Sequence, residues 1–116
     1  MFVATLVVSI AFAALLAVSA AGKLKGDPMQ METLERVGAV KLRPLLAFLE
    51  FAGAAGLLVG LAWWPLGVAA GAGLVLYFAG AVAAHLRVGD RKILPPVLLL
   101  IVSLAAGALQ LASGLS

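Results

Sequence analysis

Four long stretches of this sequence are apolar and almost free of charge, and they constrain the fold more than any other feature. They cover residues 2–22, 45–63, 66–86 and 94–115. A helix needs about 20 apolar residues to cross about 30 Å of hydrocarbon, and each stretch is close to that length. The alternation of apolar and polar residues that marks a membrane β-barrel is absent. The sequence therefore predicts four membrane-spanning helices.

The composition excludes most soluble classes of protein. Of the 116 residues, 65% are hydrophobic and 11% are charged, whereas soluble domains have about 25% charged residues. So short a chain has too few polar side chains to cover a water-facing surface, which excludes soluble enzymes and nucleic-acid-binding proteins despite a net charge of +3. With no cysteine and one histidine, we predict no metal site, no disulfide and no thiol chemistry.

The positive charges lie in two of the predicted loops and indicate the orientation. They are Lys23, Lys25, Arg36, Lys41 and Arg43 between the first two spans, and Arg87, Arg91 and Lys92 between the last two. Because basic loops stay in the cytoplasm, we predict a multi-pass protein of the cell inner membrane with both loops cytoplasmic and both termini outside. The first span also resembles a signal peptide, but it lacks a preceding positive charge and is too long, so we expect it to be retained.

The first cytoplasmic loop has the pattern of a short amphipathic helix. Asp27 and Pro28 match an N-cap and a first helical residue, and Gln30 matches the partner in a capping box. Apolar residues then recur at helical spacing as far as Leu42. We predict an interfacial helix over residues 28–42, the alternative being a solvated loop.

Each predicted span has one face of polar or small residues. At 100° per residue, Thr5, Ser9, Ser19 and Lys23 lie within about 40° of one line along the first helix. In the other spans Glu50 shares a face with Gly53, Leu57 and Gly60, Tyr77 with Ala81 and His85, and Ser103 with Gly107 and Gln110. Such faces pack against one another in membranes. The predicted fold class is all-α, an integral membrane four-helix bundle forming one domain over residues 1–116.

Glu50 is the strongest candidate for a functional residue. It is the one acidic residue within the predicted spans and lies about 6–9 Å inside the second, where a charged side chain is costly and usually functional. His85 and Lys23 lie at the same level, so we expect the three to meet in a pocket open to the cytoplasmic leaflet. We predict Glu50 and His85 to be catalytic acid–base residues. The predicted substrate-binding residues are Lys23, Tyr77, Arg87 and Ser19.

Two of these assignments have alternatives. Arg87 lies about 200° around the helix from His85, so the alternative to a site role is an interfacial position with its charge in water. His85 could act simply as a partner of Glu50 rather than transfer a proton.

Several short motifs resemble the DoxX-like membrane proteins. They are Ser19-Ala-Ala-Gly22-Lys23-Leu24, Glu50 with Gly53, the run from Gly56 to Leu61, and Ala83-Ala-His85-Leu86-Arg87. The resemblance covers nearly the whole chain and implies four spans, a longer first cytoplasmic loop and a tight turn between the middle spans. The family name also implies a link to the small subunit of a thiosulfate:quinone oxidoreductase and to membrane redox systems. The absence of cysteine departs from any thiol-based redox role.

These observations lead to three hypotheses about function. In the first, the pocket binds or converts a small hydrophobic molecule, such as a quinone, an isoprenoid or an epoxide, by acid–base isomerisation, ring opening or cyclisation. In the second, the chain is a non-catalytic subunit of a membrane redox or transport complex. In the third, it is a small oligomeric transporter.

The expected partners follow from these hypotheses. We predict the lipid bilayer and a small hydrophobic ligand as partners, no nucleic acid, and either a homo-oligomer or a larger membrane complex. No cofactor is predicted. A haem with His85 as its one axial ligand, or a bound quinone, stays open as an alternative.

Overall fold

The computed structural model describes residues 2–89, 91 and 93–115, and the regular structure in this part of the chain is helical throughout. The elements are α1 (Phe2–Lys25), α2 (Pro28–Arg36), the 3₁₀ turn η1 (Val40–Leu42), α3 (Arg43–Gly60), α4 (Trp64–Arg87) and α5 (Leu94–Leu115). By length and composition, α1, α4, α5 and the segment Val40–Gly60 are each apolar enough to cross a membrane. The predicted all-α, multi-pass membrane fold is confirmed.

The four long helices follow the predicted spans to within about three residues at each end. The largest differences are at two C-terminal ends. α1 ends at Lys25 instead of the predicted residue 22, and α3 ends at Gly60 instead of the predicted residue 63. Trp63 has an extended backbone and serves as the N-cap of α4, with Pro65 in the first turn. The tight turn therefore starts earlier than predicted, because a proline favours the start of a helix.

The first basic loop contains a shorter helix than predicted. Asp27 caps α2 as expected, with its side chain accepting a hydrogen bond from the backbone nitrogen of Gln30 at 3.4 Å. The predicted helix over residues 28–42 is divided, since α2 ends at Arg36 and η1 covers only Val40–Leu42. Gly38 has a φ of +74°, a left-handed conformation that is common just after a helix and ends it.

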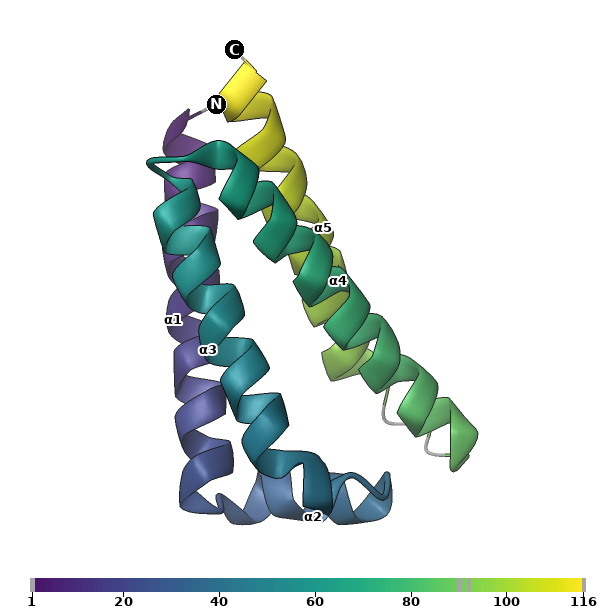
Figure 1. Cartoon of the computed structure of the whole chain (residues 1–116). Helices are drawn as coiled ribbons and strands as arrows, with labels where there is room; N and C mark the ends of the chain where they lie inside the picture. The colour runs from purple at the N-terminus through teal and green to yellow at the C-terminus, as the bar shows by residue number, and fades with distance from the viewer. Residues whose placement is uncertain (1, 90, 92, 116) are drawn as a thin grey trace.

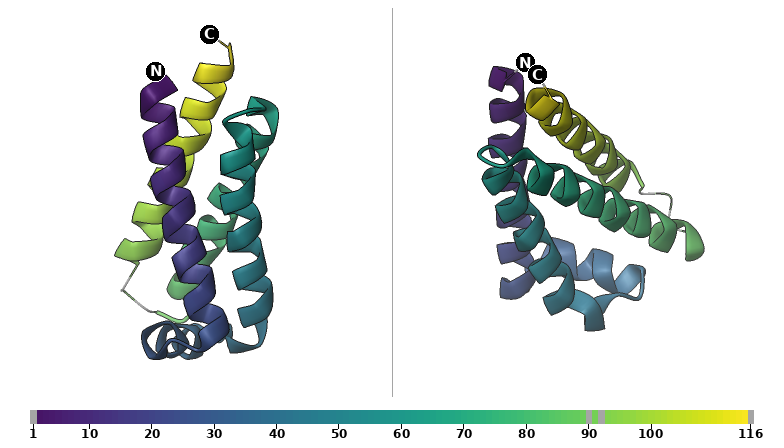
Figure 2. Two further views of the ribbon diagram at one scale, coloured as in Figure 1. Left: turned by 90° about the vertical axis from the view of Figure 1, so that its left-hand side faces the viewer. Right: turned by 45° about the horizontal axis from the view of Figure 1, so that its top comes forward.

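The long helices form two pairs that come together at one end of the molecule. α1 packs against α3, α4 packs against α5, and α3 contacts α4. Figure 1 shows both termini at the end where the pairs meet, and the pairs diverging toward the end where α2 lies across the bundle. The right-hand view of Figure 2 shows the same divergence. We call the end that carries α2 the basic end, because Arg36, Lys41, Arg43 and, at the end of α4, Arg87 are there.

Glycines permit the close contacts between helices. A Cβ atom on Gly71 of α4 would lie 2.7 Å from the Cα atom of Gly107 on α5. A Cβ atom on Gly60 of α3 would lie 2.6 Å from the Oε1 atom of Gln110 on α5, and one on Gly67 of α4 would overlap the same oxygen. Small residues that let helix backbones approach are the usual contact residues in membranes.

Polar side chains join the helices inside the bundle near the termini. The Nε2 atom of Gln110 donates hydrogen bonds to Ser9 Oγ and to the Leu57 carbonyl oxygen, both at 2.9 Å. The Thr5 and Ser113 hydroxyls lie 2.5 Å apart. The polar faces predicted for the first and last spans therefore do meet, and their hydrogen bonds connect α1, α3 and α5.

An apolar cluster fills the middle of the bundle. Phe12 and Leu16 from α1, Leu57 from α3 and Phe78 from α4 are among its fully buried members. The rings of Phe12 and Phe78 are inclined by 35°, with their centroids 6.3 Å apart. The ring of Phe78 thus connects α4 with α1 inside the bundle.

Candidate functional site

A buried ion pair links α1 to α3 on the basic side of the cluster. Lys23 Nζ lies 2.6 Å from Glu50 Oε1, and the two side chains are 11% and 2% exposed. Glu50 is seven residues into α3, or about 10 Å from its start, whereas Lys23 lies in the last turn of α1. The long lysine side chain spans the difference in level, so each charge is held inside the bundle by the other.

The ammonium of Lys23 has two further acceptors. Its Nζ atom donates to Ser19 Oγ at 3.1 Å and to Gln30 Oε1 at 2.9 Å. Gln30 is itself fixed, because its Nε2 atom donates to the Ser19 carbonyl oxygen at 3.1 Å. The Lys23 ammonium thus has two hydrogen-bond acceptors, in Ser19 and Gln30, and one ion-pair partner, in Glu50. The lysine is therefore held in one position between α1, α2 and α3.

Tyr77 approaches the same carboxylate from α4. Its phenol is an electrostatic and hydrogen-bonding neighbour of Glu50, and its ring packs edge-on against Phe78 with centroids 4.9 Å apart. Glu50 therefore lies between a lysine from α1 and a tyrosine from α4. The carboxylate thus has neighbours in both helix pairs.

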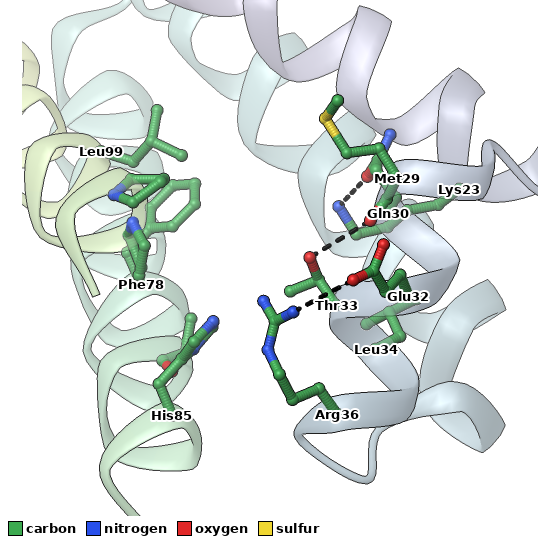
Figure 3. A pocket seen from close by; sticks show the side chains of 13 residues that line it. Lys23, Met29, Gln30, Glu32, Thr33, Leu34, Arg36, Phe78, His85 and Leu99 are labelled. Atoms are coloured by element: carbon green, nitrogen blue, oxygen red, sulfur yellow. Dashed lines mark hydrogen bonds and ion pairs between the residues drawn. The ribbon is translucent and has the colours of Figure 1, made fainter. Parts of the chain in front are cut away.

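A cavity of about 610 Å³ opens beside this cluster at the basic end, between α2 and the α4–α5 pair. We call it the basal cavity. Figure 3 shows Lys23, Gln30 and Arg36 on one side of it and Phe78, His85 and Leu99 on the other. Glu50 is not among its lining residues, so a molecule in the cavity meets Lys23, with Glu50 behind it.

His85 contributes an imidazole to the opposite wall of the basal cavity. Its side chain is buried on α4, and its Nδ1 atom lies 2.7 Å from the Ala81 carbonyl oxygen. A carbonyl can only accept a hydrogen bond, so Nδ1 carries a proton and Nε2 is the nitrogen that gains or loses one. Arg36 on α2, which pairs with Glu32 at 3.6 Å, faces His85 across the cavity (Figure 3).

Arg87 does not join this cluster. It is exposed at the end of α4 and lines a smaller hollow of about 330 Å³ with residues that include Val37 and Gly80. Of the predicted site residues, the structure thus gathers Lys23, Ser19 and Glu50 in one hydrogen-bonded group. It places His85 across the basal cavity, Tyr77 on the far side of Glu50, and Arg87 apart.

Sequence reasoning missed the contribution of α2. Gln30 was predicted as a capping-box residue, but its side chain binds Lys23 and Ser19 instead of the N-cap backbone. Arg36 and Glu32 also line the basal cavity. The signal available was the amphipathic pattern of α2, which indicates that one face of the helix is covered. It does not indicate which part of the bundle covers that face.

The donor atoms suit hydrogen bonding and proton transfer to a small molecule. A lysine and a histidine face the same mostly apolar cavity, and both can exchange protons. Among the residues that the structure describes, no three His, Cys, Asp or Glu side chains are grouped as metal ligands would be.

The sequence profile of one protein family matches almost the whole chain. The DoxX-like family matches residues 7–111, a range that includes α3, α4, most of α1 and α5, and the entire candidate site. Comparisons with curated proteins and with solved structures gave no match. The match extends over far more than half of the chain, so this protein belongs to the DoxX-like family.

Proposed function

We propose that this protein binds a small hydrophobic molecule with one polar group in the basal cavity, where Lys23 and His85 contact the polar group. The observation that carries the proposal is a largely buried ammonium that is paired with Glu50 and hydrogen-bonded to Ser19 and Gln30. It faces a mostly apolar cavity with an imidazole on its other wall. A mostly apolar cavity that has polar side chains on opposite walls is typical of ligand sites.

The buried ion pair supports a functional role because buried ion pairs contribute little to the stability of a fold. Taking both charges out of water costs several kcal/mol each, and apolar replacements of similar volume often give an equally stable or more stable protein. Lys23 and Glu50 are nonetheless held together deep in the bundle. Ionisable groups placed at such a cost inside membrane proteins usually serve binding or proton transfer.

The chemistry available in the basal cavity is acid–base. Lys23 can donate a hydrogen bond or a proton to an oxygen of the ligand, and His85 can accept or donate one through Nε2. Glu50 acts through Lys23, by holding its charge in place, and is thus a positioning residue. The reactions consistent with this set are isomerisation, ring opening or cyclisation of an uncharged lipophile, none of which requires electron transfer.

Mass spectrometry of molecules that co-purify with the protein tests the proposal. The wild-type protein, extracted in mild detergent, should retain a lipophile in near-stoichiometric amount. Ala81→Leu should reduce the retained amount at least tenfold, because Ala81 lines the basal cavity and the larger side chain fills it. Ala79→Leu, on the exposed face of the same helix, is the matched control and should retain the lipophile.

Two results would contradict the proposal. One is equal retention of the same molecule by the wild-type protein and by the Ala81→Leu variant. The other is a wild-type protein that carries only bulk lipid but co-purifies with stoichiometric larger membrane proteins, which would favour the hypothesis of a non-catalytic subunit.

A further inference from the structure

A second hollow lies on the other side of Glu50, between α3 and α4. It measures about 560 Å³, and we call it the α3–α4 groove. Among the described residues that line it, Tyr77 is polar and the rest are apolar or glycine. On α4 the lining runs from Leu66 to Tyr77, or about 16 Å along the helix. The groove is therefore an elongated apolar channel with one hydroxyl at its basic end.

The groove is hollow because side chains are missing from its walls. Gly73 lies at its centre on α4, and a Cβ atom built there would meet nothing within 4 Å. By contrast, a Cβ atom on Gly53 of α3 would lie 2.5 Å from the side chain of Leu74. Gly53 thus brings the helices together, whereas Gly73 leaves open space that faces the groove.

The bonding of Tyr77 restricts what its hydroxyl can recognise. The phenol is a hydrogen-bonding neighbour of the Glu50 carboxylate, which is paired with Lys23 and can only accept. The phenol has one proton, and the neighbouring carboxylate is the acceptor toward which that proton is directed. The lone pairs of the Tyr77 oxygen are then available as acceptors toward the groove. A partner at this position must donate a hydrogen bond.

The depth of Tyr77 restricts the charge of that partner. Tyr77 lies ten residues before the end of α4 at Arg87, or about 15 Å along the helix. A phosphate headgroup at that depth would have to leave water, at a cost that membranes rarely allow. An uncharged hydroxyl that finds an acceptor there avoids most of this cost.

We infer that the α3–α4 groove is a second binding site, which takes an uncharged lipophilic alcohol or phenol from the bilayer. The apolar chain lies along Gly73 toward Leu66, and the hydroxyl donates to the oxygen of Tyr77. This site is separate from the basal cavity, with which it shares none of the described lining residues. The inference about this site can therefore be tested independently of ligand binding at His85.

Photocrosslinking with a defined probe tests this inference. The probe is a linear twelve-carbon alcohol with a diazirine in its chain, and the competitors are dodecanol and its methyl ether. Dodecanol should displace the probe from peptides of α3 and α4 about five- to tenfold better than the ether, which cannot donate the hydrogen bond. In the Tyr77→Phe variant the two competitors should become equal.

A matched pair of glycine variants tests the position of the chain. Gly73→Leu should abolish the displaceable crosslinking. Its Cβ atom meets nothing within 4 Å, and the rest of the side chain would occupy the groove. Gly80→Leu is the matched control on the same helix, where a Cβ atom also meets nothing within 4 Å. Gly80 lines the hollow beside Arg87 and not the α3–α4 groove. It should crosslink as the wild type does.

Three results would overturn the inference. They are crosslinking that Gly73→Leu leaves unchanged, equal competition by alcohol and ether in the wild type, and displacement by phospholipid alone, which would mean binding of bulk lipid only. The Ala81→Leu variant separates this inference from the proposed function, since it fills the basal cavity and should leave crosslinking of the α3–α4 groove intact.

Discussion

Replacing Lys23 with methionine would leave the carboxyl of Glu50 without its cation at a position where the side chain is only 2% exposed. A buried charge that loses its partner destabilises a protein by about 3–5 kcal/mol. The carboxyl can escape part of this cost by taking up a proton. An ordinary glutamate, with a pKa of about 4.3, costs about 3.7 kcal/mol to protonate at pH 7, so Lys23→Met should cost no more than about 4 kcal/mol there.

The same reasoning gives a pH dependence and an asymmetry between the two partners. At pH 5 protonating an ordinary glutamate costs only about 1 kcal/mol, so most of the destabilisation by Lys23→Met should disappear. Glu50→Gln should cost less, about 1–3 kcal/mol at both pH values, because Lys23 is closer to water and keeps Ser19 and Gln30 as acceptors. A double variant with two apolar residues, Lys23→Met with Glu50→Leu, should fall within about 1 kcal/mol of the wild type.

Unfolding by dodecyl sulfate in mixed micelles, followed by tryptophan fluorescence, measures these free energies. Trp64 is a suitable reporter because it packs against Gly114 where α4 meets α5. Lys41→Met, which removes an exposed charge from η1, is the control and should change the free energy of unfolding by less than about 0.5 kcal/mol. A cost of Lys23→Met below 1 kcal/mol at pH 7, or one that is equal at pH 5, would refute the account of a buried pair.

Three further predictions concern packing and orientation. Gly67→Ala should lower the free energy of unfolding by about 1–3 kcal/mol in the same assay, because its Cβ atom would overlap Oε1 of Gln110. Gly80→Ala, where the Cβ atom meets nothing within 4 Å, should be neutral or stabilising. Equal effects of the two variants would contradict the close contact at Gly67. Gln110→Leu should cost about 1–3 kcal/mol because two hydrogen bonds are lost, and an unchanged stability would show that these bonds contribute nothing. The chain has no cysteine, so single cysteine variants can be labelled without background. A membrane-impermeant maleimide should label Leu115→Cys in intact cells and Lys41→Cys only after lysis. The reverse pattern would contradict the predicted orientation.

The helices could be predicted because each one carries its own signal. A span is defined by about 20 consecutive apolar residues, and its faces follow from the 100° step of the helix. That is why the buried positions of Glu50, Ser103 and Gln110 agree with the predicted faces. The end of α2 was misjudged for the opposite reason: Gly38 is compatible with a helical pattern, and only its positive φ shows that the chain turns there.

The site was less predictable because it depends on contacts between elements that are far apart in sequence. Glu50 stood out alone, since an acid inside a span is unusual in any arrangement. The choice of Lys23 as its partner depends on how α1 pairs with α3, and the role of Gln30 depends on where α2 lies. The position of Tyr77, beside Glu50 and in the α3–α4 groove, likewise requires the placement of α4.

The uneven packing of the bundle explains why its polar groups form two different sets. Near the termini, Gly67 and Gly71 of α4 allow close approach to α3 and α5, and the polar groups there bond to one another. Toward the basic end the pairs diverge (Figure 1), and polar side chains there, such as Gln30 and His85, line the basal cavity instead. A charge held in such a place needs partners from several helices, and Lys23 obtains them from α1, α2 and α3. The divergence thus leaves room for the basal cavity, and Lys23 lines this cavity with its charge paired to Glu50.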